Sequence, residues 1–324
     1  MSEPATGSEP ATGSAPTPTT RVFGPIRLMP GVLPRHVGAY LWAAFVSIGV
    51  FTYATALQPY LLEVNIGVPQ GERGRVTGDL QFWQEIVTLL LFGVFGAWSD
   101  RVGRRTVYIF GFLVTALAYA AFPFADDTGQ LLIYRLVFAV GVAALGGMLA
   151  TVLADYPQDP GRGKLTGLSF TLNALGALLF LAFLVRMPQW YRDAGLSEVD
   201  AGRAAYLTVA VVCLVSAGLM AFLKPGRPEQ VTERLPLLTL VSQGLAAGRN
   251  PRVSLAYAAS FAARADLAII ATFFTLWVQK AALADGLTPA QAAQSQGMMF
   301  GIVDRKSTRL NSSHEWISRM PSSA

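Results

Sequence analysis

Apolar residues gather into seven long runs that are separated by short polar connections. The runs lie at about 38–61, 79–98, 106–124, 130–153, 165–185, 204–223 and 253–278. Each approaches the length of about 20 residues that an α-helix needs to cross about 30 Å of hydrocarbon. Because open strands cannot satisfy their backbone polar groups in lipid, the runs are predicted to be membrane-spanning helices.

The composition excludes an ordinary soluble domain and a nucleic-acid-binding protein. Charged residues make up 14% of the chain and hydrophobic residues 52%, whereas soluble domains have about 25% charged residues. The basic residues are spread between the apolar runs and form no phosphate-binding stripe. We therefore expect the partners to be the lipid bilayer and a small-molecule solute, with no nucleic acid.

Residues 1–36 are predicted to form a disordered cytoplasmic tail. The segment opens with a direct repeat of "SEPATG", at Ser2–Gly7 and Ser8–Gly13, followed by "SAPTPTT". Proline, serine, threonine and glycine without apolar side chains cannot offset the entropy that folding removes. The segment also lacks the basic start and apolar core of a signal peptide.

The basic residues predict the orientation of the chain, because cytoplasmic loops carry an excess of lysine and arginine. With a cytoplasmic N-terminus, six basic residues fall in the outer loops: Arg73, Arg75, Arg186, Arg192, Arg203 and Lys280. Thirteen then fall on the inner side: Arg21, Arg27, Arg35, Arg101, Arg104, Arg105, Arg162, Lys164, Lys224, Arg227, Arg234, Arg249 and Arg252. The count predicts a multi-pass protein of a bacterial plasma (inner) membrane with its N-terminus in the cytoplasm.

The most charged short connection is "GAWSDRVGRR", from Gly96 to Arg105, between the second and third runs. Glycines are expected where the chain reverses direction or where helix ends pack closely. The arginines hold the connection on the cytoplasmic side, and Asp100 can accept hydrogen bonds from them. A charged turn with no further role is the alternative interpretation.

This stretch resembles the loop between helices two and three of the major facilitator superfamily, which is written G-x-L-a-D-R-x-G-R-R/K. Trp98 replaces the usual leucine and Ser99 the usual small residue. The matching positions are Gly96, Asp100, Arg101, Gly103, Arg104 and Arg105. The resemblance implies an all-α polytopic fold of two six-helix bundles, each built from inverted three-helix repeats, with a substrate path between them.

On this topology the chain divides into a tail, one complete bundle and the start of a second. The N-terminal six-helix transmembrane bundle is expected at 37–223, and a cytoplasmic linker with a short surface helix at 224–252. Helix 7 and a stub of helix 8 would occupy 253–303. "PRHVGAY" (Pro34–Tyr40) and "PRVSLAY" (Pro251–Tyr257) each lead into an apolar run, as a repeat between the two halves predicts.

Charges inside the apolar runs are candidates for function, because each costs about 2.5–3.5 kcal/mol at the helix centre on insertion scales. Glu85 and Arg135 fall at similar depth, so we expect them to form an ion pair that relieves their desolvation. The resemblance implies a role for Arg135 in proton coupling or in binding substrate charge. Alternatively, Arg135 extends to the outer interface.

Two further charges, Arg264 and Asp266, lie near the middle of the seventh run. Residues two apart point in nearly opposite directions on a helix, so they are poor partners for each other. Arg264 shares a face with Tyr257, Ser260 and Phe261, which predicts a substrate-lining stripe. Asp266 is the candidate carboxylate for proton coupling.

Asp155 ends the fourth run, in "LADYPQDPGRGKLTG". The resemblance implies that an acidic residue here bonds the loop arginines and stabilises one state of the transport cycle. We therefore expect Asp100, Arg104 and Asp155 to form a gating cluster. An ordinary loop acid is the alternative.

The predicted function is secondary transport of a small solute by alternating access, proton-coupled, without cofactor or metal, in a protein that is monomeric when full length. No G-x-S-x-G, no H-E-x-x-H and no paired membrane aspartates occur, so an intramembrane enzyme is disfavoured. Ala177 follows Gly176 where related drug–proton antiporters carry G-P-x-x-G-G. The alternative is a polytopic membrane receptor or partner protein without transport activity.

The last residues break the pattern. An eighth run should cover about 297–315, but "DRKSTRLNSSHEWISRMPSSA" places Asp304, Arg305, Lys306 and Arg309 within it. Such a segment would not span a membrane, and it resembles translated sequencing-adapter sequence. We expect the native protein sequence to stop near Val303, with 304–324 non-native, and this truncated chain itself to be inactive in transport.

Overall fold

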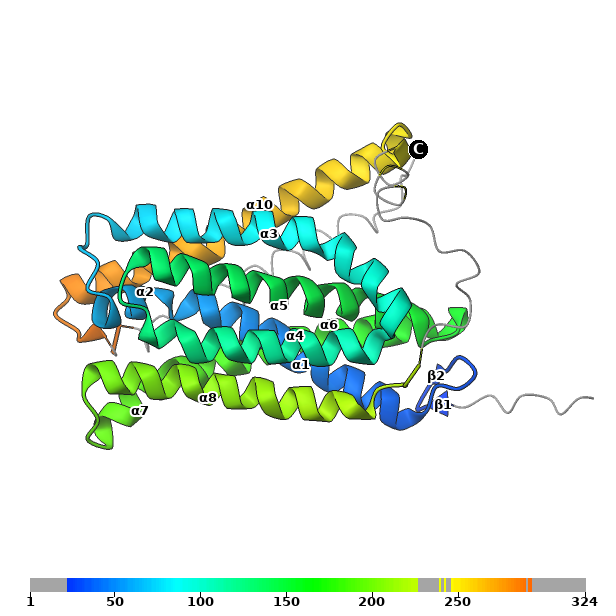
Figure 1. Cartoon of the computed structure of the whole chain (residues 1–324), viewed down its shortest axis with the longest axis horizontal. Coiled ribbons are helices and arrows are strands. Elements are labelled where there is room, and N and C mark those ends of the chain that lie inside the picture. Colours follow the sequence, from blue (N-terminus) through cyan, green and yellow to red (C-terminus); the bar gives the residue numbers. More distant parts are fainter. Residues whose placement is uncertain (1–21, 227–238, 240–241, 243–245, 290, 293–324) are drawn as a thin grey trace, which may run out of the picture.

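The computed structural model describes residues 22–226, 239, 242, 246–289 and 291–292, and the backbone alone at 257, 260–272 and 274–275. Two short strands precede a series of helices (Figure 1). The strands are β1 (Val22–Phe23) and β2 (Ile26–Arg27). The helices are α1 (Pro34–Ala56), α2 (Gln58–Tyr60), α3 (Arg73–Val102), α4 (Arg104–Ala121), α5 (Thr128–Asp155), α6 (Asp159–Phe183), α7 (Met187–Asp193), α8 (Glu198–Leu219) and α10 (Pro251–Ala284).

Short π-helical or 3₁₀ segments extend several of these helices. A π-helical turn, Leu61–Asn65, continues α2, and 3₁₀ turns follow α4, α6 and α8 at Phe122–Phe124, Leu184–Arg186 and Met220–Phe222. Within the residues that the structure describes, six helical stretches are long and apolar enough to cross a membrane, beginning with Pro34–Asn65 and ending with Glu198–Phe222. The expected all-α polytopic architecture is confirmed, and each of the six helical stretches begins before the predicted start of its apolar run.

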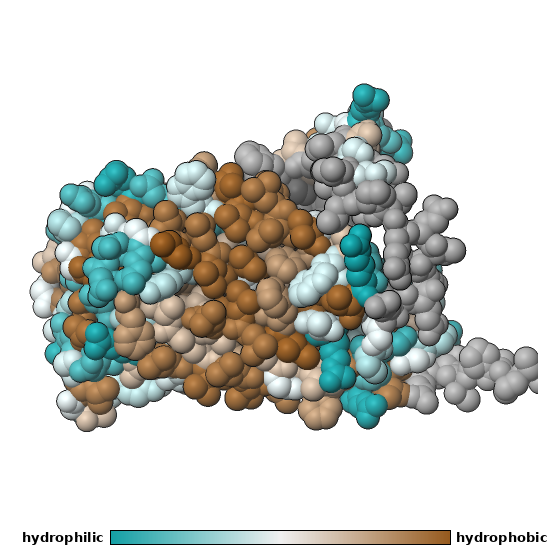
Figure 2. All heavy atoms as spheres, viewed as in Figure 1, coloured by the Kyte–Doolittle hydropathy of each residue, from teal (hydrophilic) through white to brown (hydrophobic). Residues whose placement is uncertain are grey.

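The surface has the pattern that a bilayer requires. On the face that Figure 2 shows, a broad hydrophobic band crosses the middle of the molecule, with hydrophilic residues toward both ends. Leu89, Leu117 and Phe170, on three different helices, are more than 60% exposed. Large apolar side chains are stable at such a surface when they face lipid.

Local sequence explains where the helices begin. Pro34 occupies the first turn of α1, where a missing backbone N–H leaves no hydrogen bond unmade. The Asp127 side chain accepts a hydrogen bond from the Gln130 backbone at 2.8 Å and caps α5. Ser197 caps α8 by accepting from the Asp200 backbone at 3.1 Å. Each cap satisfies a backbone donor that the helix itself cannot.

The helices pack as two related units of three spans. The first unit is α1, α3 and α4, and the second is α5, α6 and α8. The pairs with the most extensive packing are α1–α6, α3–α5, α4–α5 and α4–α8. Exchanging the two units converts the α1–α6 pair into the α5–α3 pair and returns the α4–α8 pair to itself, as inverted repeats predict. The α4–α5 pair has no such counterpart, because α8 and α1 pack against each other much less.

Glycines allow close approach of α1 and α6. A methyl group placed on Gly176 would lie 1.8 Å from the Phe45 carbonyl oxygen, so the two backbones touch there. A methyl on Gly49 would lie 2.6 Å from the ring of Phe180. Small residues at helix contacts are the usual means of tight packing in membranes.

Residues 22–36 correct the prediction of a disordered tail that extends to position 36. The β1–β2 hairpin packs against the connection between α5 and α6, where the Met29 backbone N–H donates to the Tyr156 carbonyl at 3.0 Å. Ile26 and Leu28 are fully buried. Burial of these apolar side chains offsets the conformational entropy that is lost when the segment is ordered. Residues 1–20 have almost no apolar side chains that could do the same. Residues 1–21 lie outside the described part.

Other predictions fall on residues that the structure does not describe. The surface helix of the linker lies mostly outside the described residues, as do the stub of helix 8 and the segment 304–324. The seventh apolar run lies within a helix, α10. Figure 1 shows its Ala284 end beside α2 and its Pro251 end set away from the bundle.

Candidate functional site

The charged connection between the second and third spans is almost entirely helical. Helix α3 continues through Val102, and α4 begins at Arg104, so the chain reverses at Gly103 alone. Gly103 has φ +95°, a conformation that side-chain-bearing residues rarely adopt. A methyl group on Gly96 would meet no atom of the described residues within 4 Å. The expectation that the motif's glycines serve reversal or close packing therefore holds for Gly103 and not for Gly96.

Arg104 joins the two carboxylates that the sequence predicted to be its partners. Its Nη1 lies 2.5 Å from Asp100 Oδ1, and its Nε donates to Asp155 Oδ2 at 3.0 Å. Arg104 begins α4 and Asp100 lies in α3, whereas Asp155 ends α5. The ion cluster, defined as Asp100, Arg104 and Asp155, therefore connects the first three-span unit to the second.

A serine completes the ion cluster. Arg104 Nη1 also donates to Ser99 Oγ, and Ser99 Oγ donates to the Gly96 carbonyl at 2.6 Å. Among the ion pairs of the described residues none involves Arg101 or Arg105, and Arg101 is exposed. From the sequence, Ser99 was interpreted only as a replacement for the small residue of the motif. Its position five residues before Arg104, across the turn, was the signal that could have identified it.

Trp98 occupies the position of the usual leucine in the motif and anchors the turn. Its ring packs edge-on against Phe110 of α4, with centroids 5.2 Å apart, and lies 5.9 Å from Phe95 of α3. The three rings join the end of α3 to α4. The departure from the motif thus preserves a large apolar contact.

Hydrogen bonds beside the ion cluster connect it to the segment before the bundle and to the segment after it. The Lys224 backbone N–H donates to the Tyr156 hydroxyl at 3.2 Å, and Lys224 Nζ donates to the Pro30 carbonyl at 3.4 Å. Burial raises the pKa of Tyr156 to about 12, against the opposing effect of the bond from Lys224. The hydroxyl next to Asp155 therefore stays protonated at physiological pH.

Arg135, the predicted charge of the fourth span, is inside the bundle and only 3% exposed. It does not reach the outer interface, which was the alternative interpretation. Its guanidinium lies over the rings of Phe138 and Phe122, at 5.4 and 5.9 Å, and Nη1 donates to the Ala54 carbonyl at 3.4 Å. These contacts are weak compensation for a buried charge.

The predicted direct ion pair of Glu85 and Arg135 is not formed. Gln81 stands between them: its Oε1 accepts from Arg135 Nη2 at 3.5 Å, and its Nε2 donates to Glu85 Oε1 at 3.0 Å. No ion pair among the described residues joins Glu85 to Arg135. Because a glutamine amide both donates and accepts, it can connect opposite charges that are too far apart to touch.

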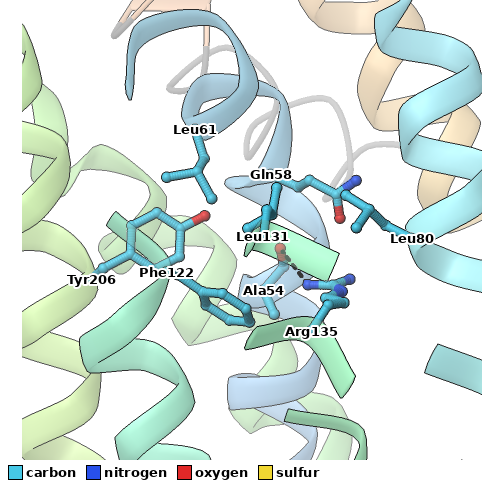
Figure 3. A pocket seen from close by; sticks show the side chains of 8 residues that line it. All are labelled: Ala54, Gln58, Leu61, Leu80, Phe122, Leu131, Arg135 and Tyr206. Carbon is cyan, nitrogen blue, oxygen red and sulfur yellow. Dashed lines mark hydrogen bonds between the residues drawn. The ribbon is translucent and has the colours of Figure 1, made fainter. Parts of the chain in front are cut away.

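A cavity of about 10 Å³ lies beside Arg135, which is room for about one water molecule. Figure 3 shows Arg135 and Gln58 on one side of it and the Tyr206 hydroxyl on the other, with apolar walls from Leu61, Leu80 and Phe122. Arg135 Nε has no hydrogen-bond partner among the described residues. The site therefore holds a buried cation with unused hydrogen-bonding capacity.

Polar side chains line one face of α3 around Glu85. Thr77, Gln81, Gln84 and Thr88 share this region of the helix, at spacings of three and four residues. The hydroxyls of Thr77 and Thr88 and the Oε1 of Gln84 are buried without partners in the described part of the chain. The sequence reading selected only Glu85, although polar residues at helical spacing in a membrane span were the available signal.

Arg264 and Asp266 both lie in α10, as predicted. The structure describes only their backbone. The described residues contain no group of three or more histidine, cysteine, aspartate or glutamate residues that could hold a metal ion.

Comparison with known proteins agrees with this architecture. The model of the Major Facilitator Superfamily matches residues 39–312. Magnetosome protein MamH of Paramagnetospirillum magneticum is 27% identical over 278 residues, which cover 83% of this chain and 62% of MamH. The chain thus spans about three fifths of the length of this curated relative.

Two solved structures share the fold. One is a bacterial homologue of the human lysosomal transporter Spinster in an inward-facing, unoccupied conformation, with a TM-score of 0.65 and 16% identity over 90% of this chain and 65% of that one. The other is a D-xylose–proton symporter, with a TM-score of 0.54 and 14% identity over 81% of this chain and 65% of that one.

Proposed function

The chain belongs to the Major Facilitator Superfamily, and we propose that it forms the first bundle and seventh helix of a secondary transporter that moves a small solute by alternating access. The role is non-enzymatic. The observation that carries the proposal is the position of Arg104, which binds one carboxylate from each three-span unit. Partly exposed ion pairs add only about 0–1 kcal/mol to stability. Such pairs are suited to form in one state and break in another.

The ion cluster is proposed to close or hold the cytoplasmic end of the solute path. Asp155 and Asp100 are about 40% exposed, whereas Arg104 is about 15% exposed. The Arg104–Asp155 contact joins the two three-span units at one end of the first bundle, and we expect it to form or break as this bundle moves against the second. Gly103 permits the sharp turn that places Arg104 there, and Arg101 and Arg105 are proposed to hold the loop at the cytoplasmic surface.

Arg135, Glu85, Arg264 and Asp266 are proposed to carry substrate binding and proton coupling. A buried guanidinium with an unused donor favours binding of an anionic group, from the solute or from a carboxylate that changes position. Gln81 links Arg135 to Glu85, so protonation of Glu85 would alter the field at Arg135. Asp266 is the proposed coupling carboxylate in α10.

Replacing Gln81 with leucine should lower the transport rate about fivefold, because it removes two hydrogen bonds worth about 1 kcal/mol in net terms. Exchanging the charges in a Glu85→Arg, Arg135→Glu double variant should restore part of the activity that either single change removes, since the Gln81 amide can reverse. The rescue should disappear when Gln81→Leu is added. Initial rates in proteoliposomes measure all four effects.

Gln189→Leu is the matched control for this series, because Gln189 is bonded to Asp193 within the short helix α7, between the fifth and sixth spans. Its transport rate should equal that of the wild type. A double charge exchange as inactive as the single changes would contradict the Gln81-mediated link.

Asp266→Asn should make the transport rate independent of external pH, because asparagine cannot exchange a proton. The wild-type rate should change with pH across the titration of the carboxyl. The measurement is uptake at a series of external pH values with internal pH fixed. An unaltered pH profile in Asp266→Asn would remove Asp266 from the coupling role.

The membrane placement follows from the same proposal. We place the protein in the plasma (inner) membrane with its N-terminus in the cytoplasm, as the excess of basic residues in the alternate loops favours. The full-length protein is proposed to act as a monomer. The β1–β2 hairpin, the ion cluster and Lys224 would then share the cytoplasmic side.

The solute can be found by thermal unfolding of the full gene product in a library of small molecules. A ligand at 100 times its dissociation constant should stabilise the folded state by about 2.7 kcal/mol. Arg135→Gln should abolish stabilisation by an anionic ligand. A transporter is supported if the stabilising compound is also moved across the membrane, and a receptor is supported if it binds without flux.

A further inference from the structure

One acidic side chain joins three helical segments at the opposite end of the bundle from Arg104. Glu63 lies in the π-helical turn that follows α2. Its Oε2 lies 3.0 Å from Arg73 Nη1, and the same oxygen accepts a hydrogen bond from Gln279 Nε2 at 3.0 Å. Arg73 is the first residue of α3, and Gln279 lies in α10. A single carboxylate oxygen thus holds the second span and the seventh helix against the end of the first.

The three side chains are largely withdrawn from solvent. The side chain of Arg73 is 13% exposed and that of Glu63 is 18% exposed, and Gln279 is buried. Arg73 Nε also donates to the Val68 carbonyl at 2.9 Å, which fixes the guanidinium. Hydrogen bonds that involve an ionised group are roughly twice as strong as neutral ones.

Apolar packing supports the same end of α10. Leu276 and Phe273 lie over Gly74 and Gly78 of α3, where added methyl groups would be 3.8 and 3.9 Å from those side chains. Toward the opposite end of α10 the side chains that the structure describes are mostly exposed, and Leu255 there is 71% exposed. In Figure 1 the Pro251 end of α10 stands away from α3. The helix is therefore attached near Glu63 and diverges toward the Arg104 end.

We propose that Glu63, Arg73 and Gln279 form the outer latch of the solute path, which rests on the transporter function proposed above. Alternating access requires the path to be closed at one end when it is open at the other. Here α10 is held to the first bundle at the outer end and separated from it at the inner end. Opening the outer end requires Gln279 to leave the Glu63 carboxylate. Glu63 and Gln279 are positioning residues in this scheme.

Spin-label distances in the full gene product, reconstituted in nanodiscs, test the latch. A Cys213→Ala background removes the buried native thiol. Ala194→Cys with Asp285→Cys reports the outer end, and Thr106→Cys with Arg252→Cys reports the inner end, all at exposed positions. In Glu63→Ala and Gln279→Ala the longer outer distance should become about tenfold more populated, since one bond to a charged group is lost.

Graded variants separate a latch from a general loss of structure. Gln279→Glu places a second carboxylate beside Glu63 and should open the outer end further than Gln279→Ala. Glu63→Gln keeps an acceptor for Gln279 and should open it less than Glu63→Ala. Asp200→Ala breaks the exposed pair of Asp200 with Arg203 at the same end. This control should leave both distances unchanged.

The latch proposal is overturned if the outer distance in Glu63→Ala and Gln279→Ala equals that of the wild type, or if Asp200→Ala shifts it equally. Solute flux in the same preparations separates this failure from failure of the transporter proposal. If solute flux is observed but the variants do not change the distances, the transporter proposal stands and the latch proposal is wrong. If the variants shift the distances but the wild-type protein shows no flux, the contact between the helices stands as a latch and the transporter proposal is wrong.

Discussion

Replacing Gly176 with alanine should lower the free energy of unfolding by about 3 kcal/mol, at the upper end of the usual range for overpacking. The new methyl group would lie 1.8 Å from the Phe45 carbonyl oxygen and 2.8 Å from its carbonyl carbon. Backbone cannot rotate away as a flexible side chain can, so α1 and α6 must separate. Their contact is among the most extensive in the bundle, and its loss should reduce both thermal stability and yield of folded protein.

Gly167→Ala in the same helix is the matched control. A methyl group on Gly167 meets no atom within 4 Å, and alanine favours helix by about 1 kcal/mol over glycine. Thermal unfolding in detergent should therefore show Gly176→Ala roughly 6–12 °C below the wild type and Gly167→Ala at or above it. Equal melting temperatures for the two variants would contradict the tight α1–α6 contact.

Replacing Arg104 with alanine should reduce the transport rate by about tenfold or more, since its contact with Asp100 in the first unit and its contact with Asp155 in the second are both lost. The free energy of unfolding should change by only about 1 kcal/mol, because the carboxylates are partly exposed. Arg104→Lys should be nearly as defective. Arginine reaches Asp155 through Nε and Asp100 through Nη1, whereas lysine has a single nitrogen.

The control for this prediction lies on the connection that follows Asp155. Arg162 and Asp159 form a more exposed pair at 3.3 Å within α6, and Asp159→Asn should transport like the wild type. Initial uptake rates and thermal unfolding on the same preparations give both readouts. Wild-type transport by Arg104→Lys would show that a point charge suffices, and the proposed bridging role would be wrong.

Much of the fold could be predicted from the sequence because lipid leaves few structural choices. Long apolar runs must be helices in a membrane, and the charges and glycines of "GAWSDRVGRR" predicted that the chain turns within this stretch, which the structure places at Gly103. The same motif led to Asp155, which is far from Arg104 in sequence. Helix ends were less accurate, because polar residues such as Arg73 and Asp159 continue a helix beyond the apolar run.

The interior charges were harder to place. Position along the apolar runs placed Glu85 and Arg135 at a similar depth in the membrane. It could not give the distance between the two helices, which Gln81 spans by bonding to both side chains. A neutral glutamine in an apolar run carries no charge signal, although its spacing of four from Glu85 places both on one helix face. Contacts between spans depend on helix rotation, which periodicity in an almost uniformly apolar run does not define.

The two ends of the bundle show the same limit. Residues 22–36 were assigned to the tail because they precede the first run, but Ile26 and Leu28 find a buried surface that other segments create. Glu63 was overlooked because it lies in a polar connection, and its significance depends on Gln279, more than two hundred residues later. Such partnerships arise from tertiary packing and have no local sequence signal.

Flux of an identified solute through proteoliposomes that contain the full gene product is the most direct test of the central claim, which is secondary transport by alternating access. We expect saturable uptake that is accelerated by an imposed proton gradient, slowed about tenfold or more in Arg104→Ala, and retained in Asp159→Asn. Binding of the solute without any flux, under every imposed gradient, would contradict the account and support a receptor or partner protein.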